Sequence, residues 1–424
     1  MLGGIEPFAG PAMKRLTDLL APGQRVFVPT MSGESALLAE ELAAQPERAR
    51  EVTFCGAMFP GIDRTDFLAV HAGARVEAVF MSPSVRRGLA EGRARLLALD
   101  YRALARHLLE APPFDVAIAQ LTPPDADGWC HPGLAVDFMP LVWPRARRRV
   151  AHLNPRLPRI ASSFRVHVSE IDIAVEAART PLTWAEPVCG EVESRIGAHV
   201  AGLVRDGDTL QFGIGSVPVA LAGALAGHRR LRIHGGMVSG ALRTLWEGGA
   251  LDRDARITSG VVLGDEALHA FAGALPNLWL TDVRHTHDPA VLGALPRFVA
   301  INSAVEVDLF GQVNAERAAG VLQAGAGGLP AFAQGALASP GGRLLICLPA
   351  TARGGTVTRI VPALGSGALC TLPRLQADAI ATEHGVAQLR GLDIESRAQA
   401  LIGIAAPAHR AALAEAWQAL RRAL

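Results

Sequence analysis

The segment Gly207-Asp-Thr-Leu-Gln-Phe-Gly-Ile-Gly-Ser-Val-Pro218 combines a turn, a buried strand and a small-residue loop that opens a helix. A weaker echo occurs at Gly23-Gln-Arg-Val-Phe-Val-Pro-Thr-Met31, which also precedes an Ala/Leu-rich helical stretch. Units of this kind are typical of parallel sheets covered by helices. The glycine spacing in the first segment is not GxGxxG, so it gives little support to a dinucleotide-binding fold.

Short apolar runs alternate with stretches of helical period along the rest of the chain. This alternation predicts an α/β protein with mostly parallel sheets. We expect helices at 35–43, 194–204 and 409–424, the last an amphipathic helix that packs on the body of the protein. We expect strands at 25–29, 75–80, 115–118, 209–212, 230–233, 256–263, 298–301 and 344–348.

Residues 181–186 interrupt this pattern and are the best candidate for a linker. The chain of 424 residues is also too long for one typical core, since domains of about 100–200 residues are usual. We therefore predict one domain at 1–185 and a second at 186–424.

The charged residues are nearly balanced, with 41 Lys and Arg against 40 Asp and Glu, which gives no electrostatic support to nucleic-acid binding. No run reaches about 18 uninterrupted apolar residues, so a membrane span is not expected. The basic residues are almost all arginine, which suits recognition of carboxylates and phosphates. A GC-rich genome explains the arginine excess equally well.

The cysteines are scattered, odd in number and form no CxxC pair, which argues against a disulfide framework or a zinc site. Their use favours a reducing compartment. The first residues include Glu6 and lack a basic stretch followed by an apolar run, so a signal peptide is not expected. We expect a cytoplasmic protein. The five cysteines are Cys55, Cys130, Cys189, Cys347 and Cys370.

Two glycine-rich loops are candidates for ligand binding. Phe212-Gly-Ile-Gly-Ser-Val-Pro218 lies between a predicted strand and a predicted helix, where free amides attract negative charge; a simple tight turn is the alternative. Gly325-Ala-Gly-Gly-Leu329 could lie along an elongated ligand that a side chain would obstruct; a surface turn explains it equally well. The residues alone thus indicate two glycine loops suited to an elongated anionic ligand.

Several carboxylates stand at the ends of predicted strands. Glu306 and Asp308 alternate with valines, which places both on one face of an extended segment. Glu383, with His384 beside it, follows an apolar run. A solvated strand edge or a strand-end turn accounts for these groups as well, and His167 fits a structural role in a strand. The chain has no HExxH, P-loop or GxSxG motif and no cluster with metal-ligand spacing, so we expect no metal.

Together, these segments resemble the acetyl-CoA hydrolase/transferase family, which includes 4-hydroxybutyrate and acetate CoA-transferases, over most of the chain. The resemblance implies two Rossmann-like α/β domains, an active site in the interdomain cleft, and CoA held largely by the C-terminal half. Its clearest pieces are Gln120-Leu-Thr-Pro-Pro-Asp125, Gly128-Trp-Cys130, His167-Val-Ser-Glu-Ile-Asp172, Gly213-Ile-Gly215 with Pro218, residues 301–312, the loop 325–328, Arg359-Ile-Val-Pro362 and Thr382-Glu-His-Gly385.

The mechanism that the resemblance implies begins with a glutamate that attacks the thioester carbonyl, giving an acyl–glutamyl anhydride and CoA thiolate. A glutamyl-CoA thioester follows and passes CoA to an acceptor acid. Backbone amides of a glycine loop stabilise the oxyanion, and Gly213 and Gly215 are the candidates for that role. The candidates for binding CoA are Gly325, Ala326, Gly327 and Gly328.

The chain departs from the family at the position of this glutamate. The family reads His-Thr-Glu-Met where the chain has His234-Gly-Gly-Met237, so Gly236 takes the place of the nucleophile. A carboxylate relocated to another segment is one reading. Glu34, at the start of a predicted helix, is the first candidate, although a glutamate in a first helical turn favours the helix dipole regardless of function. Further candidates are Asp63, Glu306 and Glu383.

We expect an acyl-CoA:carboxylate CoA-transferase that moves CoA between short-chain or dicarboxylic acids. Two alternatives stay open: a thioester hydrolase that activates water through one of these carboxylates, and a catalytically silent acyl-CoA-binding protein. A sugar-phosphate isomerase is more remote, because no paired base and acid can be identified. The expected ligands are coenzyme A or acyl-CoA, as a substrate, and a small carboxylic acid, with no permanently bound cofactor. A homo-oligomer is the usual state of an enzyme of this size.

Overall fold

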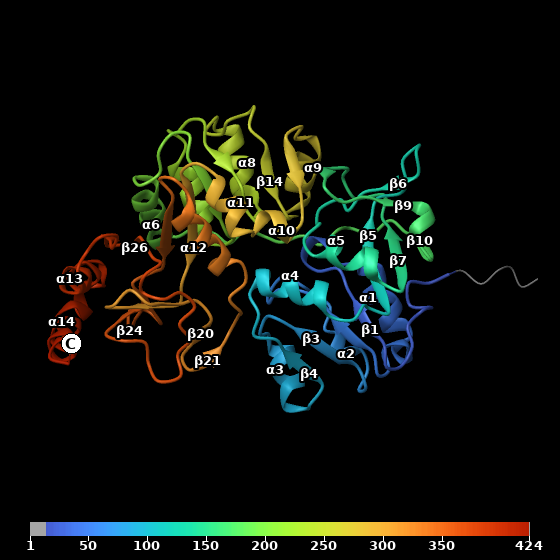
Figure 1. Cartoon of the computed structure of the whole chain (residues 1–424), viewed down its shortest axis with the longest axis horizontal. Coiled ribbons are helices and arrows are strands. Elements are labelled where there is room, and N and C mark those ends of the chain that lie inside the picture. Colours follow the sequence, from blue (N-terminus) through green and yellow to red (C-terminus); the bar gives the residue numbers. More distant parts are fainter. Residues whose placement is uncertain (1–13, 424) are drawn as a thin grey trace, which may run out of the picture.

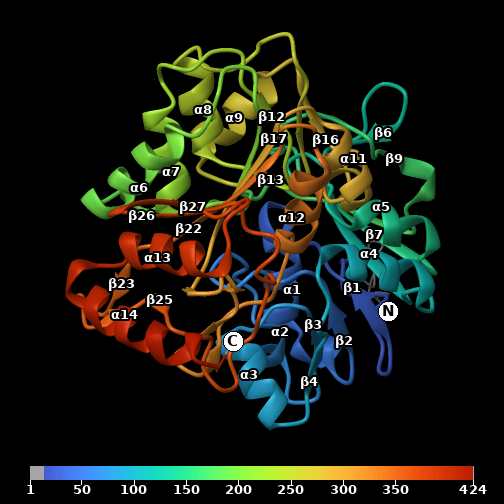
Figure 2. The same ribbon diagram turned by 60° about the vertical axis from the view of Figure 1, so that its left-hand side comes forward.

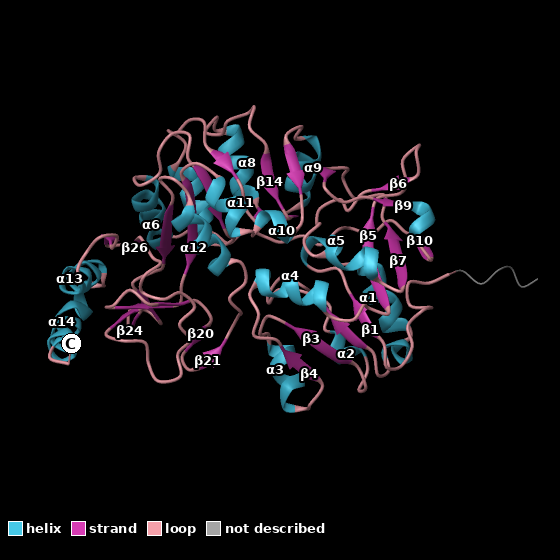
Figure 3. Ribbon diagram, viewed as in Figure 1, coloured by secondary structure: helices cyan, strands magenta, loops and turns pink. Residues whose placement is uncertain are grey.

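The computed structural model of the chain describes residues 14–423. Figure 1 shows two α/β halves side by side, the N-terminal half in blue to teal and the C-terminal half in green to red. Strands lie inside each half and helices lie around them (Figure 3). Two of the sequence-based expectations concern residues outside this range. The absence of a signal peptide involves the segment around Glu6, and the predicted C-terminal helix ends at Leu424.

The N-terminal half is built on a seven-stranded sheet in which every neighbouring pair of strands is parallel. Alternate residues of its interior strand β5 enter apolar clusters on opposite faces, Val116 and Ile118 on one and Ala117 and Ala119 on the other. Both faces are therefore covered, as parallel sheets require. In spatial order the strands are β10 (Ile173–Glu176), β7 (Arg148–Leu153), β5 (Val116–Leu121), β1 (Arg25–Phe27), β2 (Thr53–Cys55), β3 (Arg75–Ala78) and β4 (Ala94–Leu96).

Capping side chains set where the helices of this half begin. Ser35 Oγ accepts a hydrogen bond from Leu38 N at 3.2 Å, and Asp100 Oδ1 accepts one from Ala103 N at 2.7 Å. Such side chains satisfy amides that the first helical turn leaves free. The helices are α1 (Ala36–Ala44), α2 (Phe67–Val70), α3 (Pro83–Ala90), α4 (Tyr101–Glu110) and α5 (Met139–Val142), with 3₁₀ turns η1 (Met31–Gly33), η2 (Pro46–Ala49), η3 (Trp143–Arg145) and η4 (Val168–Glu170).

The C-terminal half carries a six-stranded sheet that is parallel except at one edge, where β26 and β27 are antiparallel. Strand β11 lies between β12 and β17. Both neighbours come after β11 in the sequence, so the chain leaves β11 first toward one side of the sheet and later returns on the other side. Ligands of open α/β sheets bind at the carboxyl ends of strands at such a point. In spatial order the strands are β12 (Arg232–Ile233), β11 (Thr209–Phe212), β17 (Phe298–Ser303), β22 (Arg343–Cys347), β26 (Ala379–Thr382) and β27 (Gly385–Gln388).

The last two helices, α13 and α14, lie together at the edge of this half (Figure 2). Leu413 and Trp417 of α14 are buried, and Trp417 Nε1 donates to Glu395 Oε2 at 3.0 Å. Packing of the C-terminal helix on the body is therefore confirmed. Within residues 14–423, no helix has the length and apolar character needed to span a membrane. The helices are α6 (Glu191–Ala201), α7 (Ser216–Ala224), α8 (Gly240–Glu247), α9 (Glu266–Ala274), α10 (Val283–Thr286), α11 (Pro289–Ala294), α12 (Leu329–Ala338), α13 (Ile394–Ile404) and α14 (Pro407–Arg421).

A small sheet and an apolar cluster join the two halves. Strand β8 (Ala161–Ser162) pairs with β16 (Leu278–Leu280), which pairs with β14 (Ile257–Ser259). The largest apolar cluster also draws on both main sheets, from Phe27 in the first to Ala381 in the second. The domain boundary at 185/186 stays a prediction.

The predicted strand at 256–263 is wrong as a single element. It splits at Gly260 into β14 and β15 (Val261–Val262), which belong to different sheets. The break arises because Gly260 N donates to Gly236 O at 3.0 Å, and β15 then pairs with β13 (Met237–Val238). The remaining short strands are β6 (Trp129–Cys130), β9 (Val166–His167), β18 (Glu306–Asp308), β19 (Val313–Asn314), β20 (Arg317–Ala318), β21 (Val321–Leu322), β23 (Thr351–Ala352), β24 (Val357–Thr358) and β25 (Ile360–Val361).

Candidate active site

A cavity of about 280 Å³ lies between the two halves, at the carboxyl ends of β11 and β17. Its walls are mostly apolar. Its main polar side chains are Asp137, His287, Gln211 and Asn302. The other lining residues are Met31, Phe59, Phe80, Tyr101, Phe212, Gly213, Ile214, Val217, Pro218, Gly236, Met237, Ile301, Ser303, Ala315, residues 324–328, Leu329, Phe332 and Cys347.

The first glycine loop meets this cavity at the end of β11. Gly213 lines the cavity, whereas Gly215 does not. Gly215 is the N-cap of α7 and has a φ of 120°, a conformation that favours glycine. The amides at the start of α7 therefore lie at the edge of the cavity, where a helix N-terminus stabilises negative charge.

The second glycine loop, residues 324–328, lines the cavity along its whole length and contacts the N-terminal half. Met81 N donates to Ala324 O at 3.4 Å and Tyr101 N donates to Gly327 O at 3.0 Å. A Cβ on Gly325 would lie 2.5 Å from Val79 O. Glycine is therefore needed here because another part of the protein approaches closely, whether or not a ligand also does.

His287 lies directly against Gly236. A Cβ added to Gly236 would come within 2.5 Å of His287 Cε1 and 2.8 Å of Nε2. The imidazole is 3% exposed and packs between Tyr101 and Phe332, with ring centroids 5.0 and 4.6 Å away. The space next to the α-carbon at 236, where a side chain would begin, is thus filled by this ring.

The His287 ring is held in a neutral state. Its Nδ1 is 2.8 Å from Thr286 Oγ1, and that hydroxyl lies 3.4 Å from Asp282 O, to which it can donate. Burial, and then the nearby His234, lower the pKa of His287 to about 3. A neutral imidazole carries no charge to bind an anion but can exchange hydrogen bonds with a ligand.

Asp137 is the acidic residue of the cavity lining within residues 14–423. Burial, and then the charges of Asp63 and Asp282, raise the pKa of Asp137 to about 8. No hydrogen bond from a described residue to the carboxyl of Asp137 lowers this pKa. The residue has a φ of 41°, in the left-handed region, which costs a non-glycine residue about 1–3 kcal/mol.

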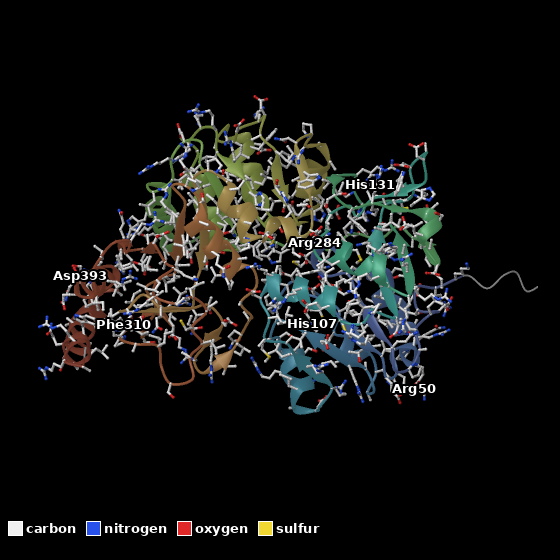
Figure 4. All side chains as sticks on the ribbon, viewed as in Figure 1. Arg50, His107, His131, Arg284, Phe310 and Asp393 are labelled. Atoms are coloured by element: carbon white, nitrogen blue, oxygen red, sulfur yellow. The ribbon has the colours of Figure 1, made fainter. Side chains whose placement is uncertain are left out.

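The charge of Asp282 is partly compensated by an arginine. Arg284, labelled near the centre of the view in Figure 4, donates through Nε and Nη2 to the two Asp282 carboxylate oxygens, both at 2.9 Å. Such a two-point pair fixes the carboxylate in place. Asp282 is therefore engaged by its own element, whereas Asp137 lines the cavity.

Glu34 and Asp63 lie behind the cavity wall and do not line it. Glu34 accepts hydrogen bonds from Arg64 N at 2.8 Å and Thr65 N at 2.9 Å. Asp63 accepts from Met31 N at 2.6 Å and Phe59 N at 2.5 Å, and so positions two residues of the wall. Burial, with a contribution from Glu34, raises the pKa of Asp63 to about 7 despite these amides. The catalytic role of Glu34 stays a prediction.

The other two candidate carboxylates are engaged elsewhere. Glu306 Oε1 accepts from Asn314 Nδ2 at 2.9 Å, and Glu383 Oε2 accepts from Ala350 N at 2.8 Å. Neither lines the cavity. Among residues 14–423, no group of three or more His, Cys, Asp or Glu side chains is placed to hold a metal ion.

Both halves match one protein family. Residues 12–184 match the acetyl-CoA hydrolase/transferase N-terminal domain, and residues 264–417 match the acetyl-CoA hydrolase/transferase C-terminal domain. The chain belongs to the acetyl-CoA hydrolase/transferase family. The resemblance inferred from the sequence is thereby confirmed.

Curated members of the acetyl-CoA hydrolase/transferase family align over most of the chain. The 4-hydroxybutyrate coenzyme A transferase of Clostridium kluyveri is 35% identical over 80% of this chain and 81% of its own length. The succinyl-CoA:cyclohexane-1-carboxylate CoA transferase of Geobacter metallireducens is 31% identical over 94% of this chain and 93% of its own length. These relatives are CoA-transferases by name.

Solved structures share the fold. RipA from Yersinia pestis superposes with a TM-score of 0.87 over 96% of this chain and 97% of its own, at 24% identity, which bears on the fold alone. The 4-hydroxybutyrate CoA-transferase from Porphyromonas gingivalis gives a TM-score of 0.79 at 27% identity, over 97% of both chains. The predicted α/β class with mostly parallel sheets is confirmed.

Sequence reasoning missed several cavity residues of this family member. Asn302 Nδ2 donates to Gln211 Oε1 at 2.8 Å across neighbouring strands. Both residues stand at the carboxyl ends of strands, a signal that could have found them. Asp137, Tyr101 and His287 carry no such signal, because they come from separate segments that only the fold brings together.

Proposed function

We propose that the chain is an acyl-CoA:carboxylate CoA-transferase that moves CoA between short-chain carboxylic acids. The observation that carries this proposal is a single cavity, between the two halves, lined by parts of both predicted glycine loops. The CoA-transferase relatives, which align over most of the chain, support the same reaction class. Fold alone would not, since one fold hosts many functions.

The two loops have different proposed roles. Gly213 and the amides that open α7 are proposed to stabilise the oxyanion of a thioester intermediate, and Gly215 to set the turn that presents them. Gly325, Ala326, Gly327 and Gly328 are proposed to contact the pantetheine end of CoA. The mostly apolar lining suits that uncharged arm better than it suits phosphates.

The proposed ligands are acyl-CoA, as a substrate and not a permanently bound cofactor, and a small carboxylic acid. Two further proposals rest on the sequence alone: a cytoplasmic location and a homo-oligomeric state. The division into domains at 1–185 and 186–424 is likewise proposed, with the larger share of CoA contacts in the second.

The test is an assay of the purified chain with butyryl-CoA, in the presence and absence of acetate. Acetyl-CoA and free thiol are followed together by chromatography and a thiol reagent. We expect acetyl-CoA to appear only when acetate is present, with little net release of thiol. Thiol release that needs no acetate would instead establish a thioester hydrolase. Binding of CoA without turnover of butyryl-, acetyl- or succinyl-CoA would leave a silent binding protein.

A further inference from the structure

The position that the family gives to its glutamate and the carboxyl of Asp137 are neighbours in space. Val136 N donates to Gly260 O at 2.9 Å, and Gly260 N donates to Gly236 O at 3.0 Å. One residue, Gly260, therefore separates the Asp137 segment from Gly236. A Cβ added to Gly260 would lie 3.9 Å from Asp137 Oδ1, which places that oxygen beside the same backbone.

The backbone of Asp137 is held from two sides. It forms a bridge with Asp282 at the start of α10, and Val283 N donates to Asp137 O at 3.3 Å. The preceding residue is fixed by its bond to Gly260. These contacts hold the backbone of Asp137 at its positive φ beside the cavity, so the residue is placed by rigid elements.

The other candidate carboxylates lack this access. Glu34, Asp63, Glu306 and Glu383 accept hydrogen bonds from amide groups and do not line the cavity. A carboxylate whose lone pairs are engaged in this way is a poor nucleophile and is out of reach of a thioester in the cavity.

We propose that Asp137 supplies the nucleophilic carboxylate that Gly236 does not. The proposal rests on the proposed CoA-transferase function. An Asp137 carboxylate oxygen attacks the thioester carbonyl, the C–S bond breaks, and an acyl–aspartyl anhydride and CoA thiolate result. The thiolate attacks the aspartyl carbonyl, the C–O bond to it breaks, and the donor acid leaves, with an aspartyl-CoA thioester remaining.

The second half of the cycle reverses these steps with the acceptor acid. Its carboxylate attacks the aspartyl thioester carbonyl and releases CoA thiolate, giving an acceptor–aspartyl anhydride. The thiolate then attacks the acceptor carbonyl, so that acceptor-CoA leaves and the Asp137 carboxylate is restored. No proton is taken up or lost over the cycle, and no oxidant or reductant is needed.

The surroundings of Asp137 determine the pH range in which its carboxyl is ionised and can act as a nucleophile. Asp63 and Asp282 oppose its negative charge, and Tyr101 and the neutral His287 line the same cavity. The pKa of Asp137, about 8, means that the carboxyl gives up its proton to solvent only toward alkaline pH. The transfer rate is therefore expected to rise from pH 6 to about pH 8 and then to level off.

The experiment combines a chemical trap with matched variants. The wild-type chain is incubated with butyryl-CoA and then with hydroxylamine, which converts an aspartyl thioester or anhydride into a hydroxamate that peptide mass spectrometry locates. Asp137→Asn and Asp137→Glu are assayed for butyryl-CoA:acetate transfer, with Asp254→Asn, an exposed aspartate, as the matched control. Circular dichroism and thermal melting show whether each variant folds.

We expect a hydroxamate at residue 137, a loss of transfer of at least about 10³-fold in Asp137→Asn, partial activity in Asp137→Glu and wild-type activity in Asp254→Asn. A hydroxamate on a different carboxyl, or full transfer by Asp137→Asn, overturns the role of Asp137 and leaves the transferase function standing. Absence of any acyl transfer by the wild type overturns the transferase function, and this proposal with it. The trap uses the wild-type chain, so a variant that fails to fold does not remove the test.

Discussion

His287 occupies the volume that begins at the α-carbon of Gly236, and its ring also lies against Gly328. A Cβ on Gly328 would be 2.5 Å from His287 Nε2, as close as a Cβ on Gly236 would be to Cε1. The histidine and the two glycines therefore form one packing unit. The two glycines leave the space that the imidazole ring of His287 fills. A larger residue at one position requires a smaller one at another.

This packing predicts the outcome of a Gly236→Ala substitution. The new Cβ cannot be accommodated without moving a buried ring, so we expect a loss of about 1–3 kcal/mol in the free energy of unfolding. Urea denaturation measures it. The matched control is Gly223→Ala on α7, where a Cβ meets nothing within 4 Å.

A double variant separates a local clash from a general effect. Gly236→Ala combined with His287→Ala is expected to be less destabilised than the sum of the two single changes, because the smaller residue leaves room for the new methyl group. Simple additivity of the two losses would contradict the packing described here.

The buried His287 also gives stability a definite dependence on pH. Its pKa is lowered in the folded protein to about 3, so between that value and the unfolded value of about 6.5 the unfolded chain binds a proton that the folded chain does not. Stability attributable to this group therefore falls as the pH is lowered through this range, by about 1.4 kcal/mol per pH unit. His234, with a pKa lowered to about 4, acts in the same direction.

Comparison with His287→Gln isolates this contribution. Between pH 6 and pH 4.5 the free energy of unfolding of the variant is expected to fall less steeply with decreasing pH than that of the wild type. The difference between the two slopes should correspond to about one proton. Chemical denaturation at a series of pH values gives both slopes. Equal slopes would mean that His287 titrates normally in the folded protein.

At the level of elements, buried amides hold together the carboxyl edge of the first sheet. Asn154, which follows β7, donates through Nδ2 to Gln120 Oε1 and to Arg179 O, both at 2.7 Å. Gln120 on β5 in turn donates to Glu34 O at 3.0 Å. The turn that carries Met31 into the cavity wall is therefore attached to two strands through these amides.

Asn154→Ala is expected to destabilise the protein by about 1–3 kcal/mol for each buried acceptor left without a partner. The KM for acyl-CoA is also expected to rise, because the turn at Met31 loses its attachment. Thermal melting and steady-state kinetics measure the two effects. Gln418→Ala, an exposed amide on α14, serves as the control. An unchanged melting temperature in Asn154→Ala would contradict this account of the sheet edge.

The sequence predicted the strands that carry the cavity but not their surroundings. The strands expected at 209–212 and 298–301 are β11 and β17, because buried parallel strands give continuous apolar runs. The run at 256–263 looked like one strand because nothing local marks the partner change at Gly260. Asp137 and His287 escaped notice because their environment comes from contacts between segments that are distant in the sequence.

At the scale of the whole molecule, the chain order and the spatial order of the halves do not fully coincide. Strand β8, at 161–162, precedes the predicted linker yet pairs with β16 of the later half. Such a pairing leaves no signal in composition, since each strand is two or three residues long. The α/β class was therefore predictable, whereas the way the halves interlock was not.

The cavity between the halves predicts which acyl groups are accepted. Among the described lining residues there is no arginine or lysine, and the acidic one is Asp137. The second carboxylate of a succinyl group would be buried unpaired beside that acid, which is costly. We expect kcat/KM for butyryl-CoA to exceed that for succinyl-CoA by at least about tenfold, or about 1.4 kcal/mol.

Steady-state kinetics with the two donors and acetate as common acceptor measure this ratio. The internal control is inhibition by free CoA, which is the part of the molecule that both donors share. The inhibition constant of free CoA should be the same in either assay. Equal or better use of succinyl-CoA would show that a cation from outside the described lining reaches the site.

The loop at 324–328 gives the molecule a further property. The same peptide groups that form a wall of the cavity also bond to Met81 and Tyr101 of the other half. A molecule bound against them adds to the cohesion between the halves, and by thermodynamic reciprocity tighter cohesion strengthens its binding to the same degree. Occupancy and cohesion therefore rise and fall together, so a tightly bound ligand strengthens the attachment between the two halves of the protein.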